Sequence, residues 1–344
     1  MCKAQECKIE GSAVAKYLSM DGVLEGIGAL LQQSMGVAMS PVELAPGEGW
    51  APGIRKMALS HGDRGPLGHI YLDLLPRPHK FSHNAHFTIR CGRSRPGGGY
   101  RAPLVALVCN FSGGGGPGSL LSHSELETLI HELGHALHSL LSRTRYQHMS
   151  GTRGALDFVE TPSHLMEHFV WDERSLKVLA RHHVTKDPMP SGMVARLRKS
   201  KSLYSALDLQ SQVVMSLLDQ DYFGTSPPGR GETTAMLEAL QRQHSVVGPT
   251  PGTCQQVRFG HLVGYGAGYY SYLYARCFSG ALWRELFSED PLSPAAGERY
   301  WQGLLRHGSS RDPAALMKGL VGEGAMLEVE GGFIPNVKSG DFDL

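Results

Sequence analysis

The sequence has little net charge, no long apolar run and no organised set of cysteines. Its 33 basic and 32 acidic residues leave a formal net charge of +1, so the composition carries no electrostatic signature of nucleic-acid or membrane binding. No apolar stretch approaches the roughly 18 residues that a bilayer-spanning helix needs. The cysteines are scattered without paired spacing, which favours free thiols in a reducing compartment. The six positions are Cys2, Cys7, Cys91, Cys109, Cys254 and Cys277.

The first 18 residues also lack the features of a targeting segment. They contain no apolar core of the kind found in signal peptides, and they are not rich in arginine and serine, as transit peptides are. A cytoplasmic location is therefore the default expectation from these residues alone.

What is present indicates a mainly α fold with a small β-sheet. Hydrophobic residues make up 41% of the chain, which supports a real core. We expect one domain over residues 1–330, with a small sheet region at about 60–112, a helical region at about 120–310 and a poorly ordered tail at 331–344. Runs of β-type composition predict strands at 67–74, 86–91 and 104–111. Apolar residues at helical spacing predict helices at 21–35, 123–142, 162–183, 193–222, 232–243, 259–288 and 294–306.

The helix predicted at 123–142 contains the sequence His131-Glu132-Leu133-Gly134-His135, an HExxH motif. Two histidines four residues apart project from the same side of a helix, so both imidazoles can reach one Zn²⁺. Glu132 is then placed to take a proton from a water molecule at the metal. The motif indicates metal-assisted hydrolysis of a peptide bond.

The surroundings of the motif favour a metal site over two solvated surface histidines. Leucine and isoleucine residues form one apolar stripe along the helix, and the histidines fall on a different side. Ser122 or Ser124 is a candidate N-cap, followed by acidic residues in the first turn. The stripe consists of Leu126, Leu129, Ile130, Leu133, Leu137, Leu140 and Leu141.

A zinc hydrolase needs a third protein ligand and an open coordination position. The metzincin pattern, with a histidine ten residues after the first, is excluded because Leu141 stands there. His138 would have to bend back to reach the metal, so we expect it to be packed in the protein or to support a ligand. The remaining candidates are Asp157, Glu160 and Glu167 on the next predicted helix, and helical geometry alone does not choose among them.

The segments HELGHALH at 131–138 and DFVETPSHLMEHFVWD at 157–172 closely resemble the thimet oligopeptidase family of zinc peptidases, family M3. The resemblance implies a zincin-type metallopeptidase domain with one Zn²⁺ per chain. It also implies that the glutamate opening the E-T-P-S motif, Glu160, is the third ligand beside His131 and His135, with Glu132 as the general base.

If Glu160 is the third ligand, three other carboxylates near the motif are candidates to hydrogen-bond the histidines and so fix the orientation of their rings. For each of them, a solvated or capping carboxylate is an equally good interpretation. They are Glu127, Asp157 and Glu167.

Several stretches resemble most closely the mitochondrial intermediate peptidase branch of this family. They are residues 67–80, 86–93, 142–153 and 259–273. The branch implies trimming of N-terminal octapeptides from imported precursor proteins in the mitochondrial matrix. A general oligopeptidase that degrades short peptides is the alternative within the family.

Members of the family are roughly twice as long, and the resemblance covers only their catalytic second half. The helical half that roofs the substrate channel is therefore expected to be missing from this sequence. A truncated, non-catalytic fragment is accordingly a third hypothesis, although no metal ligand is missing.

The stretch 259–273 alternates glycines with aromatic residues. Glycine makes a backbone permissive, and a mobile loop that carries hydrogen-bond donors suits the stabilisation of an oxyanion. The resemblance implies substrate and transition-state contacts for His261, Tyr269 and Tyr272. Packing in the core is the alternative, and it is the expectation for Tyr265, Tyr270 and Tyr274.

The strand predicted at 104–111 is followed by glycines at 113–116, which we interpret as a linker. In the family, the corresponding strand lines the cleft and pairs with the substrate backbone by strand addition. An ordinary strand within a sheet is the other interpretation.

Overall fold

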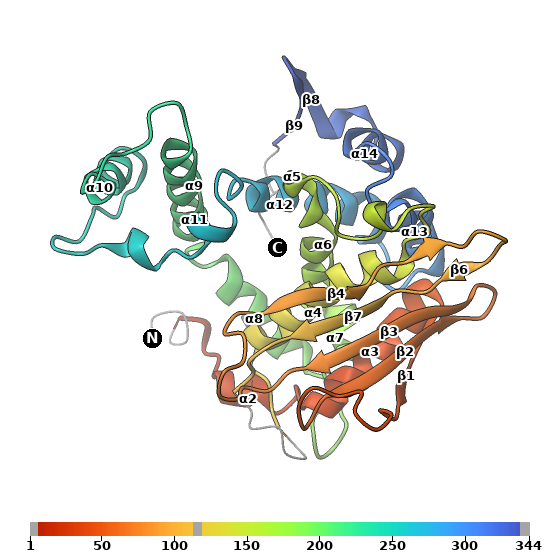
Figure 1. Cartoon of the computed structure of the whole chain (residues 1–344). Helices are drawn as coiled ribbons and strands as arrows, with labels where there is room; N and C mark the ends of the chain where they lie inside the picture. The colour runs from red at the N-terminus through yellow and green to blue at the C-terminus, as the bar shows by residue number, and fades with distance from the viewer. Residues whose placement is uncertain (1–5, 113–118, 338–344) are drawn as a thin grey trace.

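The computed structural model describes residues 6–112 and 119–337. Its main sheet has five strands in the order β1-β2-β3-β7-β4 (Figure 1). The first three strands are antiparallel, β7 runs parallel to β3, and β4 pairs antiparallel with β7 as an edge strand. The strands are β1 (Val37–Val42), β2 (Arg55–His61), β3 (Gly65–Asp73), β4 (Ala85–Arg90) and β7 (Leu104–Val108).

The rest of the described chain is mainly helical, with two small hairpins. The hairpins are β5 (Arg93–Ser94) with β6 (Tyr100–Arg101), and β8 (Met326–Val329) with β9 (Gly332–Pro335). The helices are α2 (Gly11–Ala15), α3 (Met20–Met35), α4 (His123–Leu141), α5 (Leu156–Val159), α6 (Thr161–Phe169), α7 (Glu173–Leu179), α8 (Ser191–Ser202), α9 (Ser205–Tyr222), α10 (Thr233–His244), α11 (His261–Gly264), α12 (Ser271–Leu282), α13 (Pro294–Gly303) and α14 (Pro313–Val321).

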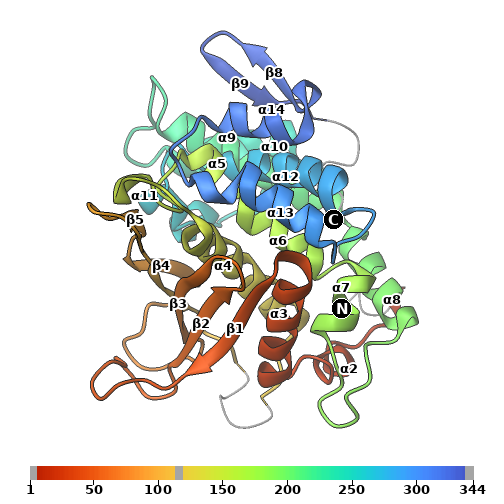
Figure 2. The same ribbon diagram turned by 90° about the vertical axis from the view of Figure 1, so that its right-hand side faces the viewer.

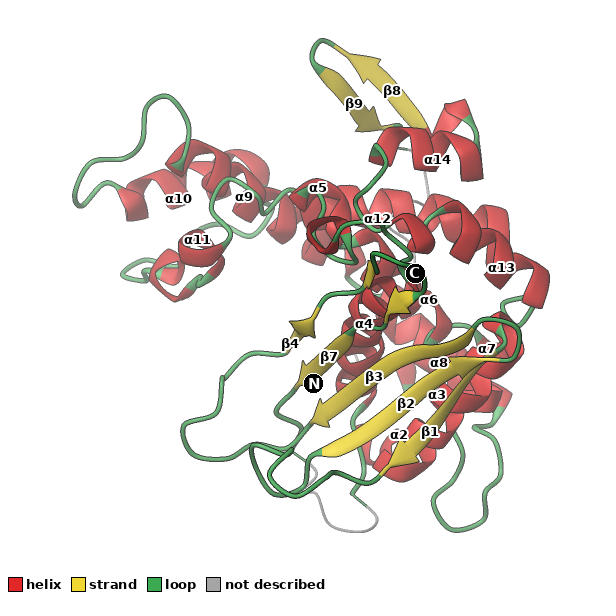
Figure 3. Cartoon of the chain, turned by 45° about the vertical axis from the view of Figure 1, so that its right-hand side comes forward, coloured by secondary structure: helices red, strands yellow, loops and turns green. Residues whose placement is uncertain are grey.

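The helices α3 and α4 cover one face of the sheet, as Figure 3 shows. Behind α4 lies α6, and α12 packs on α6 in turn, while α13 lies against α3 (Figure 2). These contacts enclose one large apolar core that runs from Val14 to Met326 in the sequence. The metal-ligand motif therefore sits on a helix buried between a sheet and a second layer of helices.

A second, smaller core lies outside this body. Helices α9, α10 and α11 project to one side in Figure 1, and Val214, Met215, Leu218, Leu237 and Tyr269 form their own buried cluster. We refer to residues 205–270 as the α9–α11 module. It carries residues 259–270 of the glycine- and tyrosine-rich stretch, whereas Tyr272 lies on α12, which packs on α6 of the main body and also touches the smaller core.

The mainly α architecture with a small sheet is confirmed, but the sheet begins earlier than the sequence predicts. The strand β1 contains Pro41, which an edge strand tolerates because one of its sides has no strand partner. The strand β2 contains Lys56, Met57, Ala58 and Leu59, which are better helix formers than strand formers, so its pairing with β1 and β3 overrides local propensity.

The predicted tail after residue 330 includes β9, which pairs with β8, and its last residues, 338–344, lie outside the described part of the chain. The glycines at 113–116 and Cys2 also lie outside the described residues. Within the described ranges, no helix combines the length and the apolar character that crossing a membrane requires.

Candidate metal centre

The helix α4 is fixed at both its start and its inner face. Ser122 is its N-cap and forms a capping box with Glu125, which satisfies two free amides at the helix start. The seven residues of the apolar stripe are each at most 3% exposed. Burial of this stripe turns the histidine side of the helix towards α6.

Gly134, in the middle of the motif, lets α4 and α6 approach closely. A Cβ atom at this position would lie 2.6 Å from the Cα of Ser163 and 2.7 Å from the carbonyl oxygen of Pro162. Both of these atoms belong to the backbone of α6, so the two helices touch where only glycine fits. The close contact brings Glu160, at the start of α6, to the two histidines of α4.

His131, His135 and Glu160 present one ligand atom each within 4.8 Å of one another. The Oε2 atom of Glu160 lies 3.0 Å from Nε2 of His135 and 3.4 Å from Nε2 of His131. Tetrahedral bonds of about 2.0–2.1 Å to zinc place ligand atoms roughly 3.3 Å apart, so the three side chains fit this ion. Two imidazoles and one carboxylate are also a donor set that suits zinc.

The charges of the cluster fit a cation as well. Burial opposes ionisation of Glu160, but His135 and His131 outweigh it and hold the pKa of its carboxyl well below the usual range. Burial also disfavours a charged His131, yet Glu160 and Glu167 raise its pKa well above the usual value. Two buried carboxylates therefore attract positive charge to His131, and a divalent cation at its Nε2 atom can supply that charge.

Glu167 lies on the other side of His131. Its Oε1 atom is 2.6 Å from Nδ1 of His131 and 3.1 Å from Nδ1 of His164. A hydrogen bond donated by Nδ1 to Glu167 leaves Nε2 of His131 free to bind a metal, and it fixes the orientation of the ring. This is the geometry expected of a carboxylate that orients an imidazole from behind.

Glu132 is 7% exposed and lies beside the two histidines of the motif. Burial raises the pKa of its carboxyl, although the neighbouring His131 and His135 act in the opposite direction. The carboxyl also accepts a hydrogen bond from the backbone of His86 on β4. A buried carboxylate with a raised pKa is suited to exchanging a proton near neutral pH.

The structure places the other two expected carboxylates away from the imidazoles. Glu127 accepts hydrogen bonds from Nε1 of Trp171 and from Nζ of Lys201, so it joins α4 to the α6–α7 connection and to α8. Asp157 is hydrogen-bonded to Tyr270 and thereby joins α5 to the start of α12. Both contacts support the helices that hold the cluster.

His138 is packed, as the sequence predicts. It is 2% exposed, and burial lowers the pKa of its imidazole to about 4. It lines a cavity together with Arg153, Ser309 and Arg311, behind the cluster. Within the described residues it belongs to no group that could hold a metal ion.

The tyrosine-rich stretch reaches the cluster through Tyr265, which was not one of the two tyrosines expected there, Tyr269 and Tyr272. The hydroxyl of Tyr265 donates a hydrogen bond to Oε1 of Glu160 at 3.3 Å, although we expected Tyr265 in the core. Tyr269, in contrast, is buried: it is 9% exposed and belongs to the core of the α9–α11 module. Its hydroxyl donates a hydrogen bond to Oε1 of Gln212 at 2.6 Å. Sequence spacing does not separate these two tyrosines because both flank glycines.

His261 and Tyr272 lie together beside Tyr265. The Tyr272 hydroxyl is 3.4 Å from Nε2 of His261, and its ring stacks on that of Tyr265 with centroids 6.1 Å apart. Burial, with nearby negative charge including that of Glu160, raises the pKa of Tyr272 above its usual value. The Tyr272 ring also lies beside that of His164 in the second metal-capable group, with centroids 6.2 Å apart.

The strand prediction for 104–111 is right, and of the two roles left open for it the structure has the ordinary strand within a sheet. The strand β7 pairs with β3 on one side and with β4 on the other, so it has no free edge for a substrate. The edge strand next to the cluster is β4. His86 on this strand contacts Ser139 of α4 through its ring, with Nε2 at 3.2 Å from Oγ, and it contacts Glu132 through its backbone.

The sequence interpretation misses three neighbours of the cluster, His86, His164 and Tyr265. His164 follows directly after the T-P-S segment and shares Glu167 with His131, forming a second group that could hold a metal. The sequence does contain a signal for this position, since His164 lies four residues after Glu160 on the same helix. No comparable signal marks His86, because its position depends on the pairing of β4.

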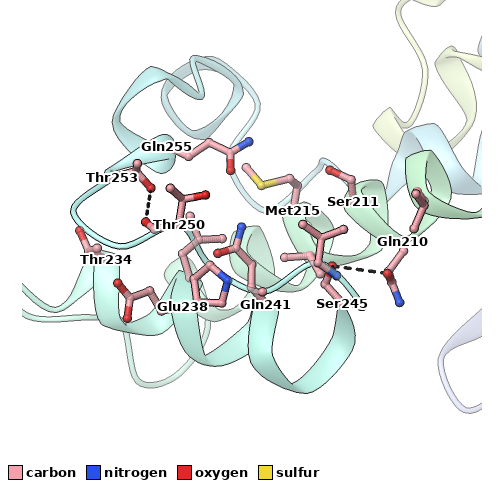
Figure 4. A pocket seen from close by; sticks show the side chains of 16 residues that line it. Gln210, Ser211, Met215, Thr234, Glu238, Gln241, Ser245, Thr250, Thr253 and Gln255 are labelled. Carbon is pink, nitrogen blue, oxygen red and sulfur yellow. Dashed lines mark hydrogen bonds between the residues drawn. The ribbon is translucent and has the colours of Figure 1, made fainter. Parts of the chain in front are cut away.

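A cavity of about 300 Å³ lies in the α9–α11 module, between α9, α10 and residues 245–255 (Figure 4). Amide and hydroxyl side chains line much of it, among them Gln210, Thr234, Gln241 and Thr250. None of its lining residues belongs to the metal-ligand group. The cavity is therefore separate from the candidate centre.

Residues 2–326 match the profile of peptidase family M3. The mitochondrial intermediate peptidase of Arabidopsis thaliana is 42% identical over 97% of this chain and 48% of its own length. The human mitochondrial intermediate peptidase is 43% identical over 93% of this chain and 45% of its own length. The chain thus spans about half the length of these curated relatives.

A solved structure named "BsuCP Crystal Structure" has a TM-score of 0.53 to this chain. It is 12% identical and covers 94% of this chain and 60% of its own. At this level of identity the likeness concerns the fold alone.

Proposed function

This chain belongs to peptidase family M3, and from that membership and the geometry of its ligand cluster we propose that it is a zinc-dependent metalloendopeptidase. The observation that carries the proposal is the group of half-buried His131 and buried His135 and Glu160, whose ligand atoms lie within 4.8 Å of one another beside the carboxyl of Glu132. Three metal ligands with a general base beside them are the groups that a zinc hydrolase uses to cleave a peptide bond.

In this proposal His131, His135 and Glu160 hold one Zn²⁺, and Glu167 orients His131. The ion, when bound, supplies a Lewis acid that polarises the scissile carbonyl group and makes water more acidic. The close packing of α4 on α6 at Gly134 holds the ligands at this spacing before any ion binds. Little reorganisation is then needed for binding.

Glu132 acts as the general base. Its carboxyl accepts a proton from the attacking water, holds it while the carbonyl carbon becomes tetrahedral, and passes it to the leaving amine. Burial favours the protonated form of this carboxyl, which lets it hold the proton between the two steps. The hydrogen bond from the backbone of His86 keeps the carboxyl group oriented.

Hydrogen-bond donors for the developing oxyanion come from the α9–α11 module and the start of α12. Tyr265 and Tyr272 keep their protons at neutral pH, since burial and the charge of Glu160 raise the pKa of Tyr265 to about 12 and shift that of Tyr272 in the same direction. His261, in contact with Tyr272, is the third candidate. Donors aimed at the reacting oxygen stabilise the transition state more than the ground state.

The substrate would lie in an extended conformation along the outer edge of β4. This edge has no strand partner in the described part of the sheet, and its residue His86 contacts both Glu132 and Ser139 of α4. A peptide added as a further strand gains backbone hydrogen bonds regardless of its sequence and is held next to the general base.

The substrate class follows from the names of the relatives. We infer that the chain acts on mitochondrial precursor proteins in the matrix, because the two similar proteins described above are called mitochondrial intermediate peptidases. A general oligopeptidase activity on short peptides is the second candidate, favoured by the sequence-independent way in which an open strand edge binds a peptide.

The test is hydrolysis of an internally quenched peptide by the purified chain, with zinc content measured in parallel. A Glu132→Gln variant should bind zinc normally and lose activity by about 10²- to 10⁴-fold. A precursor-like peptide and random short peptides are then compared, and equal rates would count against the processing role. Stoichiometric zinc with no activity in either protein would reject the proposal for this chain and favour the non-catalytic fragment.

A further inference from the structure

Asp219 is a fully buried carboxylate that binds the glycine- and tyrosine-rich loop from beneath. It lies in the last turns of α9 and is 0% exposed. Its Oδ1 atom accepts the backbone N–H of Ala267 at 2.9 Å, and its Oδ2 atom accepts the backbone N–H of Tyr269 at 2.9 Å. The two oxygens of this buried carboxylate thus accept hydrogen bonds from two backbone N–H groups of the same loop, two residues apart.

The loop at this point has a conformation that needs support. Ala267 has a φ of +60°, a region that side chains other than glycine rarely occupy. Its carbonyl oxygen accepts a hydrogen bond from Nε2 of Gln220 at 3.1 Å. Gly266 lies against the ring of Phe223, where a Cβ atom would come within 2.5 Å. The last turns of α9 therefore hold the loop through both of its backbone polar groups and through a close ring contact.

This anchored segment separates the side chains that approach the metal cluster. Tyr265 precedes it and reaches Glu160, whereas Tyr272 follows it and contacts His261. Between them, Tyr269 enters the core of the α9–α11 module. A shift of the loop at residues 267–269 would move Tyr265 and Tyr272 relative to the ligands, which are fixed by a different core.

We propose that Asp219 is a positioning residue, which holds the loop so that Tyr265 and Tyr272 face the reacting groups. The proposal rests on the proposed function for its catalytic consequence. A carboxylate is required because both of its oxygens accept hydrogen bonds, whereas an asparagine offers one oxygen and one NH₂ group. In an asparagine variant, one buried loop amide would lose its acceptor and would face another donor.

The test compares the full chain with its Asp219→Asn variant, which preserves the size of the side chain. The matched control is Asp221→Asn, which removes the same charge from an exposed position on the same helix. Amide hydrogen exchange is followed in the loop, residues 265–270, and in α4, together with zinc content and the kinetics of peptide hydrolysis. In Asp219→Asn, the loop should exchange at least tenfold faster while α4 and zinc content stay unchanged.

In the kinetic measurement kcat should fall by about 10²-fold, with KM nearly unchanged. Displaced donors would reduce the stabilisation of the transition state and leave substrate binding unaffected. Unchanged exchange in the loop would overturn the proposal, and so would faster exchange with unaltered kcat. A wild-type chain without activity would reject the proposed function, but the exchange result would still decide whether Asp219 anchors the loop. The Asp221→Asn variant should behave as wild type in every measurement.

Discussion

The contact between α4 and α6 at Gly134 offers the sharpest test of how the fold builds the metal centre. In the variant Gly134→Ala, the new Cβ atom would lie 2.6 Å from the Cα of Ser163, whereas ordinary contacts begin at 3.4 Å. The two helices must therefore separate by about 0.4–0.8 Å, because neither neighbour is a side chain that can rotate away. Glu160 moves with α6, so its distance to His135 increases.

Two opposing effects act on stability. Alanine is a better helix former than glycine by about 1 kcal/mol, and overpacking of a core costs about 1–3 kcal/mol. The net change in the free energy of unfolding of the metal-free protein should therefore be small, a loss of roughly 0–2 kcal/mol. Zinc affinity should fall as well, because ligand distances at a metal site tolerate only about 0.2 Å.

We expect the zinc Kd of Gly134→Ala to rise by at least 10- to 100-fold, or about 1.4–2.8 kcal/mol, as when a residue supporting a ligand is lost. Competition with a chromophoric chelator measures the Kd, and thermal unfolding with and without zinc measures the linked stability. Gly319→Ala is the matched control, since Gly319 also lies in a helix but a Cβ atom there meets nothing within 4 Å. Wild-type zinc affinity in Gly134→Ala would refute the view that this close contact sets the ligand spacing.

Three other predictions concern the surroundings of the centre. Glu167→Gln should weaken zinc binding by about 10- to 100-fold without loss of fold, because it removes the carboxylate that orients His131, and chelator competition would show this. Tyr265→Phe should lower kcat by about tenfold or more while zinc stays bound, because a donor to the reacting oxygen is lost. In the wild type, the pKa of Tyr265 is about 12, so this residue should cause no alkaline loss of activity below about pH 11. Burial opposes ionisation of Asp73, but hydrogen bonds from Arg77, Lys80 and Trp50 lower its pKa from 3.8 to about 2. The charged carboxylate therefore stabilises the fold above about pH 4, and this contribution is lost as the pH falls towards 2. Asp73→Asn should therefore lose about 2 kcal/mol of unfolding free energy at pH 7 and less at pH 3, as measured by denaturant titration.

The metal-ligand helix can be predicted from the sequence because local rules determine it. The apolar stripe, the cap at Ser122 and the spacing of the two histidines all lie within one segment, and the structure has a helix at His123–Leu141. The third ligand is different, because it depends on the contact between two helices. Periodicity leaves Asp157, Glu160 and Glu167 as equal candidates, and the packing at Gly134 is what brings Glu160 to the histidines.

The features that the sequence does not predict are those set by the sheet and by tertiary contacts. Whether a strand is central or at an edge depends on which strands pair, so β7 and β4 have similar sequence signals but opposite roles. The position of His86 beside Glu132 follows from the same pairing. Similarly, Tyr265 and Tyr269 differ through tertiary contacts: Tyr269 is hydrogen-bonded to Asp219 and Gln212, whereas the Tyr265 hydroxyl donates to Glu160.

The two parts of the proposed site draw on separate cores, and this separation bears on what a chain that spans about half the length of its relatives can do. The candidate ligands His131, His135 and Glu160 are fixed by the main body alone, through burial of α4 and its contact with α6. Tyr265 belongs to the α9–α11 module, Tyr272 on α12 packs against the core of that module, and the hydrogen bond from Tyr265 to Glu160 links the two parts. Metal binding should therefore need no residue beyond this chain. A failure of catalysis with zinc bound would then point to the placement of substrate or tyrosines and not to the metal centre.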